Sequence, residues 1–492
     1  MRPLPLLLLA ACADAMYYDV TFDMSGLTNP PSTGETYEDY GTNPWIDTTT
    51  QAVSTFSVDV DSGSYGVMRR DLNAGHLPEP AAIRVEEIVN YLDYGYAPPE
   101  PGAPHPFAVH LEAAPSPFGG QGRHLLRIGL KAREVPLQQR DPANLVFLVD
   151  VSGSMATADK LGLVLFSLEQ LVDKLAPTDT LSLVVYASSE GLVLPPTPVE
   201  DKSVILDALR DLNAGGSTHG EAGIRLAYEQ ASDAFRPGGV NRVILCTDGD
   251  FNVGLTGQPL FRLIETYRDQ GIFLTTLGFG MGNYNDTTLE QLADRGDGNY
   301  AYIDSQNEAL RVLGDNLVST LQVVAKDVKV QVGFTAETVR RWRLIGYENR
   351  VLNQDDFEDD AVDAGDIGAG HDVTALYELE LADGAAAPEA TLAGVDLRYK
   401  APEGGSSQLL ELDLPATAVG DSFEGASRSL RLAASVTEMA EILRHSEHSE
   451  GADWTRVRQI AEEAIGPAPT PVEEELLGLM QRAGALWDAE SP

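Results

Sequence analysis

Basic residues, cysteine and long apolar runs are scarce in this chain, and each scarcity excludes a class of protein. Its 492 residues hold 34 Lys and Arg against 75 Asp and Glu, a formal net charge of −41 at pH 7. Proteins that bind nucleic acid need clustered basic residues to neutralise phosphates, so no nucleic-acid partner is expected. The same acidity argues against electrostatic docking on anionic lipid and is typical of proteins kept soluble in cation-rich media.

The chain has two cysteines, Cys12 and Cys246. Cys246 ends the apolar run 243–246, so we expect a buried thiol in a core strand. Two cysteines so placed indicate no disulfide framework, zinc site or redox pair.

The N-terminal residues are typical of an export signal. Arg2 precedes the apolar run 4–11, which is too short to span a bilayer and ends in Leu-Ala-Ala before Cys12. This pattern resembles a bacterial lipoprotein signal, which is cleaved before the cysteine and lipidated on it. We therefore expect a lipid-anchored protein of the bacterial cell envelope, on the outer or inner membrane and facing the periplasm or the surface. An ordinary secretory signal, or a start codon placed too far downstream, remains the alternative.

Strands and helices alternate from residue 144 to about residue 321, which predicts a doubly wound α/β domain. The strand candidates are Leu145–Val149, Leu181–Tyr186, Arg242–Thr247, Phe273–Leu277 and Tyr300–Ile303. Their continuous apolar runs, separated by amphipathic helical periods, indicate a parallel sheet that is covered on both faces.

The segments on either side of this domain have a different pattern. Strand candidates without intervening helices lie before it, near Phe107 and Leu125, and after it from Val328 to Tyr399. We infer a β-sandwich built from both flanks, with the α/β domain inserted into it, and helices after Pro402. The predicted segments are 1–12, lipoprotein signal; 13–50, tether; 51–104, N-terminal extension; 105–140, first part of the sandwich; 141–320, α/β domain; 321–402, second part of the sandwich; and 403–492, C-terminal helical region.

Oxygen-bearing side chains follow three buried segments of the α/β domain. Asp150, Ser152 and Ser154 come directly after the first strand, Thr218 follows two glycines, and Asp248 ends a later strand. Crevices at the carboxyl ends of neighbouring parallel strands are where such sheets bind ligands. Hydroxyls and carboxylates suit a hard divalent cation, so we predict a site for Mg²⁺, with Mn²⁺ or Ca²⁺ as alternatives. The hydroxyls would bind the ion directly, while the two acids would mostly hold its water ligands.

These five residues resemble the metal-ion-dependent adhesion site of the von Willebrand factor type A domain, which has the pattern Asp-x-Ser-x-Ser, Thr, Asp. The resemblance extends to the bacterial YfbK-like family, and covers nearly the whole chain from about Thr48. The segments that carry it are STFSVDVDSGSYGVMRR, RVEEIVNYLDY, TDGDFNVG, LGFGMGNY, GNYAYID and RLIGYENR. It implies an N-terminal extension, a type A domain and a family-specific C-terminal region.

Three further residues, His219, Asp250 and Asn283, are candidates for the rim of the metal site. His219 could touch a bound ligand there, but an exposed surface histidine is the simpler interpretation. The segment from Asp59 to Ser64 echoes the metal motif but has one residue too many, so we interpret it as a turn and not as a second site.

A cation held mainly by hydroxyls stays electron-poor, and its open position suits a carboxylate from another molecule. The sequence therefore predicts a membrane-tethered, non-enzymatic module that captures an acidic residue of a partner protein, in adhesion or envelope assembly. One alternative is a Mg²⁺-dependent hydrolase, although the chain has no Gly-x-Ser-x-Gly elbow, His-Glu-x-x-His or Walker loop. The other is a structural scaffold whose metal has no external ligand.

Overall fold

The computed structural model describes residues 37–490, apart from 121, 188–189, 217–219, 250–256, 281–285, 384–389 and 452. Its α/β domain is built on a six-stranded sheet with the order β10-β9-β8-β5-β6-β7. The strands are β5 (Ala143–Asp150), β6 (Thr180–Tyr186), β7 (Glu190–Pro198), β8 (Val240–Thr247), β9 (Phe273–Phe279) and β10 (Tyr300–Ile303). All pairings are parallel except that of the edge strand β7, which runs antiparallel to β6.

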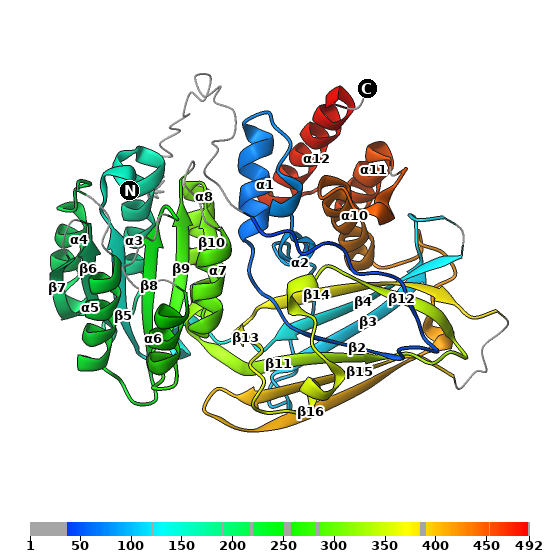
Figure 1. Ribbon diagram of the computed structural model, residues 1–492, viewed down its shortest axis with the longest axis horizontal. Coiled ribbons are helices and arrows are strands. Elements are labelled where there is room, and N and C mark those ends of the chain that lie inside the picture. Colours follow the sequence, from blue (N-terminus) through cyan, green and yellow to red (C-terminus); the bar gives the residue numbers. More distant parts are fainter. Residues whose placement is uncertain are drawn as a thin grey trace, which may run out of the picture. The chain divides into compact units, whose positions relative to one another are not determined.

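Helices cover both faces of this sheet (Figure 1). They are α3 (Leu163–Lys174), α4 (Lys202–Arg210), α5 (Gly220–Asp233), α6 (Gln258–Arg268), α7 (Asp286–Arg295), α8 (Gln306–Leu310) and α9 (Leu317–Leu321). Helices α3 and α4 share one hydrophobic core with the sheet, and α5, α6 and α7 share the other. Every residue of β5 and β8 is buried between these two layers, as their continuous apolar sequence predicts. The predicted doubly wound fold is confirmed.

The second architectural unit is a sandwich of two antiparallel sheets. One sheet has the order β1-β12-β14-β4-β3, and the other β13-β11-β15-β16, with β2 also paired to β11. Their bounds are β1 (Ile46–Asp47), β2 (Val53–Ser57), β3 (Phe107–Pro115), β4 (Arg123–Ala132), β11 (Val323–Gly333), β12 (Val339–Ile345), β13 (Gly365–Gly368), β14 (Asp372–Leu381), β15 (Thr391–Ala401) and β16 (Gly404–Pro415). Strand β4, before the α/β domain, pairs with β14, after it. The α/β domain is thus inserted between two parts of the sandwich, as predicted.

Helices from both ends of the chain share a further core. It combines α1 (Gly63–Asn73) and α2 (Val85–Val89) with α10 (Arg428–Leu443), α11 (Trp454–Ile465) and α12 (Pro471–Glu490). The helical periods recognised in the last hundred residues are the buried faces of α10, α11 and α12. No helix among the described residues combines the length and the apolar character needed to cross a bilayer.

Two local differences from the sequence-based expectations have clear physical reasons. Strand β16 occupies Gly404–Pro415, where helices were expected to begin, and the first C-terminal helix starts only at Arg428. Strand β16 is an edge strand whose first half is polar, and only residues 410–414 alternate between leucine and acid, so its strand signal is short. The helix expected from about Pro80 to Leu92 is divided into a 3₁₀ turn, Pro80–Ala82, and α2, because Ile83 and Arg84 adopt extended backbone.

Candidate metal centre

The first part of the candidate site is the loop that leaves β5. Asp150 ends this strand, which pairs with β6 on one side and β8 on the other, so the loop emerges where strand order reverses. The Asp150 carboxylate is fully buried. Its Oδ1 accepts a hydrogen bond from the backbone N–H of Ser152 at 2.8 Å, and its Oδ2 accepts one from the Thr247 hydroxyl at 3.3 Å. Asp150 is therefore held in one orientation by both neighbouring segments.

The two serine hydroxyls of this loop lie together, as their alternate spacing predicts. The Oγ atoms of Ser152 and Ser154 are 2.9 Å apart. Ser152 is buried and Ser154 is half-buried, so the pair stands at the boundary between core and solvent. A 3₁₀ turn, Gly153–Ala156, fixes the backbone between them and the following helical segment.

The segment that begins at Gly215 and leads to Thr218 contacts the same loop through its backbone. The N–H of Gly215 donates to the carbonyl of Val151 at 2.7 Å, and the N–H of Gly153 donates to the carbonyl of Gly216 at 3.0 Å. These two hydrogen bonds hold the backbone of residues 215–216 against the loop that carries Ser152 and Ser154. Thr218, which follows two residues later, lies outside the described residues, as do Cys12 and the rim candidates His219, Asp250 and Asn283.

Asp248 completes the described part of the centre. It follows β8 directly, the strand next to β5, and is 1% exposed. Its Oδ2 lies 2.8 Å from the ammonium nitrogen of Lys160, a residue that the sequence analysis did not identify. No spacing rule could have placed this lysine, because it projects from a π-helical turn, Ala158–Gly162, outside the metal motif.

The electrostatics of the centre suit a cation. Burial raises the pKa of Asp150 to about 6, opposed by the hydrogen bond from the Ser152 N–H and reinforced by the Asp248 carboxylate. Buried carboxylates are costly unless they are paired or bind metal, and Lys160 supplies a single positive charge for the two acids. Two carboxylates and two hydroxyls form a donor set that hard divalent ions prefer, so the residues present fit such an ion.

A second group of acids lies elsewhere and has a different character. Asp59, Glu87 and Glu290 place carboxylate oxygens within 4.8 Å of one another, and all three are buried. Arg84 pairs with Glu87 and also with Glu290, at 3.1 Å, and Arg350 pairs with Asp59 at 3.1 Å. Because arginines already neutralise these acids, we interpret the group as a buried ion-pair network and not as a metal centre.

The segment Asp59–Ser64, interpreted from sequence as a turn, belongs to this network. The N–H of Asp61 donates to Oδ1 of Asp59 at 2.9 Å, as in an Asx-type turn. Oδ1 of Asp61 then accepts a hydrogen bond from the N–H of Tyr300 in β10, at 2.8 Å. The turn therefore attaches the N-terminal extension to the α/β domain, a role that its sequence does not reveal.

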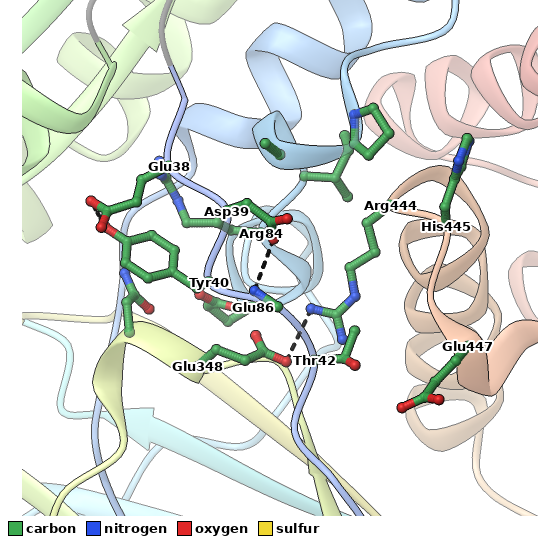
Figure 2. A pocket seen from close by; sticks show the side chains of 15 residues that line it. Glu38, Asp39, Tyr40, Thr42, Arg84, Glu86, Glu348, Arg444, His445 and Glu447 are labelled. Atoms are coloured by element: carbon green, nitrogen blue, oxygen red, sulfur yellow. Dashed lines mark hydrogen bonds and ion pairs between the residues drawn. The ribbon is translucent and has the colours of Figure 1, made fainter.

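A cavity of about 300 Å³ lies beside α2 and the end of α10 (Figure 2). Its walls are strongly charged, but opposite charges are paired: Nη1 of Arg444 lies 3.0 Å from Oε1 of Glu348. Oε2 of Glu86 accepts a hydrogen bond from the N–H of Tyr347 at 2.9 Å. None of its lining residues belongs to the metal motif, so the cavity is separate from the candidate centre.

Comparison with known proteins agrees with this architecture. Residues 144–316 match the family model of the von Willebrand factor type A domain, and residues 319–486 match the model described as "Uncharacterized protein YfbK, C-terminal". Residues 31–127 match a model described as "von Willebrand factor". The protein YfbK of Escherichia coli K12 is 39% identical to this chain over 474 residues, which cover 92% of this chain and 81% of YfbK.

Matches to solved structures were also found. A von Willebrand factor type A protein from Catenulispora acidiphila matches 78% of this chain and 92% of its own length, with 16% identity and a TM-score of 0.46. The ArnB paralog VWA2 from Sulfolobus acidocaldarius matches 77% of this chain and 98% of its own length, with 14% identity and a TM-score of 0.38.

Proposed function

Because this chain belongs to the YfbK-like family of proteins with a von Willebrand factor type A domain, we propose that it is a divalent-metal-dependent protein-binding module of the cell envelope. Type A domains are often metal-dependent interaction modules. One observation carries the proposal: Asp150, the Ser152–Ser154 hydroxyl pair and Asp248 stand at the tips of adjacent strands. Thr218 would supply the third hydroxyl from the segment that begins at Gly215.

The chemistry of this centre favours a carboxylate of a partner protein as the ligand. Hydroxyls bring no formal charge to the ion, so it keeps enough positive charge to attract an external Asp or Glu. The chain carries a net charge of −41 and repels an acidic partner at long range. The ion would then provide the local attraction, and added salt would screen the repulsion without removing the metal bond.

We further propose that the module is held on a membrane through a lipidated Cys12. The supporting observation is the sequence pattern before this cysteine, a basic start followed by the apolar run 4–11 and two alanines. Replacing Cys12 by Ser is expected to release the full-length protein from the membrane fraction of its native cells. If the membrane fraction retains as much Cys12→Ser protein as parent protein, the proposed lipid anchor is wrong. The proposal for the metal centre does not depend on this result.

The binding proposal is tested by crosslinking pull-downs from native membranes, with Mg²⁺ or with a chelator. The parent chain is expected to capture a partner in Mg²⁺ and to lose it on chelation. Asp150→Ala and Ser152→Ala are expected to reduce capture about tenfold or more, because each removes a group that holds or orients the ion. Asp173→Ala is the matched control, since it removes an exposed acid from α3 of the same domain.

Equal capture of the same partner by the parent and by Asp150→Ala, both folded, would overturn the proposal. The same preparations distinguish the hydrolase alternative. Turnover of generic phosphoester or peptide substrates that is lost in Asp248→Ala would assign an enzyme instead of a binding module.

A further inference from the structure

A lysine ammonium lies inside the candidate metal centre, although it is no part of the metal motif. Nζ of Lys160 is 2.8 Å from Oδ2 of Asp248, and the two side chains are 10% and 0% exposed. Lysine is among the residue types least often buried, and then it is usually paired. We propose that Lys160 is an internal counter-ion that neutralises Asp248 in the metal-free protein and is displaced when a divalent cation binds. This inference rests on the proposed function and concerns the regulation of the same site.

The position of the Lys160 side chain is determined by its own turn and by the residue that follows β9. It lies in the π-helical turn Ala158–Gly162, and such turns occur frequently at functional sites. Its aliphatic stem runs over Gly280, where an added Cβ would come within 2.3 Å of Cγ of Lys160 and 2.6 Å of its Cε. Gly280 has a positive φ of 77°, and its carbonyl accepts a hydrogen bond from the Tyr302 hydroxyl at 2.7 Å. Gly280, at the end of β9, therefore packs against the lysine stem and is itself held by Tyr302 of β10.

Charge balance makes the ammonium and the metal ion competitors. Asp150 and Asp248 together carry two negative charges when ionised, and the positive charge of Lys160 offsets one of them. A divalent ion at the Ser152 loop brings more positive charge to the two acids than the ammonium does, and it repels an ammonium held on the same carboxylate. Displacing Lys160 breaks a buried charge-assisted hydrogen bond, so the lysine lowers the apparent affinity for the ion.

The side chain is well suited to such an exchange. A lysine has a flexible four-carbon stem and a compact charge, so the ammonium can leave Asp248 while the backbone of the π-helical turn stays in place. In the metal-free state the ammonium offsets part of the negative charge of the two buried acids. The centre is therefore expected to stay folded without metal, with an ion affinity set by Lys160.

The test measures Mn²⁺ binding to the full chain by the electron paramagnetic resonance of free Mn²⁺, without any partner. Lys160→Met keeps the length of the stem and removes the charge, and it is expected to bind Mn²⁺ about tenfold to a hundredfold more tightly than the parent. Lys160→Arg keeps the charge, and its affinity is expected to stay near the parent value. Lys202→Met is the control for general charge effects, since it removes an exposed lysine of the same domain.

A thermal readout accompanies the binding measurement. Without metal, Lys160→Met is expected to unfold at a lower temperature than the parent, because the buried Asp248 loses its ion pair with Lys160. Added Mg²⁺ is expected to raise its unfolding temperature by more than it raises that of the parent. The double variant Asp150→Ala/Lys160→Met is expected to lose the gain in affinity, which would place the ion at this centre.

The outcomes separate this inference from the function on which it rests. If the parent binds Mn²⁺ and Lys160→Met binds it no more tightly, the counter-ion role is wrong and the metal centre stands. If Lys202→Met tightens binding as much as Lys160→Met, or the double variant keeps the gain, the role is also wrong. If neither the parent nor Lys160→Met binds Mn²⁺, the metal centre itself fails.

Discussion

The side chain of Arg350 links three parts of the chain: the sandwich, the N-terminal extension and the α/β domain. It follows β12 of the sandwich, and its side chain is 13% exposed. It contacts Asp59 at 3.1 Å and Asp61 at 3.7 Å in the N-terminal extension, and Glu290 at 3.4 Å and Asp294 at 2.9 Å in α7 of the α/β domain. We predict that Arg350→Met weakens the attachment of all three parts.

The magnitude follows from burial. Burial raises the pKa of Glu290 well above its ordinary value, and Arg84 and Arg350 are the two groups that oppose this rise. Removing one partner of a buried pair typically costs about 3–5 kcal/mol, because the remaining charge is left in a low-dielectric interior. That is a large part of the roughly 5–15 kcal/mol that stabilises a typical domain. Protonation of the stranded acids relieves the penalty, so the loss should be smaller at pH 5 than at pH 8.

Urea unfolding of the parent and of Arg350→Met at the two pH values measures the loss, and hydrogen exchange in α7 locates it. The matched control is Arg458→Ala, which removes an arginine paired with Glu462 four residues along α11, where both side chains are more than 40% exposed. Such a surface pair contributes at most about 0.5 kcal/mol. If Arg350→Met loses no more stability than Arg458→Ala, the reasoning about this network is refuted.

Three further predictions concern separate parts of the molecule. Saturating Mg²⁺, at about a hundred times its dissociation constant, should stabilise the parent by about 2.7 kcal/mol, and differential scanning calorimetry should show no such gain in Ser152→Ala. Burial raises the pKa of Glu86 from 4.5 to about 8, so its contribution to stability is complete below about pH 4.5 and is lost as pH rises through 8. Glu86→Gln should reduce this fall in the free energy of unfolding, measured by urea titrations at several pH values. An unchanged dependence of stability on pH would contradict the prediction. A Cβ at Gly63 would lie 2.3 Å from Cε1 of Tyr300, so Gly63→Ala should destabilise by about 1–3 kcal/mol. Gly478→Ala, in an open position of α12, should stabilise by up to about 1 kcal/mol, and thermal shifts of the same sign for both would contradict the packing argument.

Much of the fold was accessible from the sequence because local patterns report burial. The apolar runs ending at Asp150 and at Thr247 are both buried strands, and their parallel pairing is confirmed. The change of pattern after Leu321 marks the sandwich strands, and the helical periods beyond residue 428 mark the last three helices. Strand β16 escaped notice because its first half is polar and its alternation of leucine with acid is confined to residues 410–414.

The candidate site was accessible for a similar reason, but only in part. Residues that directly follow neighbouring parallel strands must emerge at one edge of the sheet, so Asp150 and Asp248 were expected to lie close together. The approach of Gly216 to Gly153 agrees with the position expected for the segment that carries Thr218. Thr218 itself lies outside the described residues, and its place in the centre stays a prediction.

By itself, the sequence determined where strands end and which oxygen-bearing side chains follow them, because both properties depend on neighbouring residues and on the period of each element. Tertiary structure alone decided which charges meet. Lys160 reaches Asp248 across 88 positions, and Arg350 reaches Asp59 across 291. The long side chains of lysine and arginine can take many directions, and a pairing is selected only when distant backbone segments pack and exclude water.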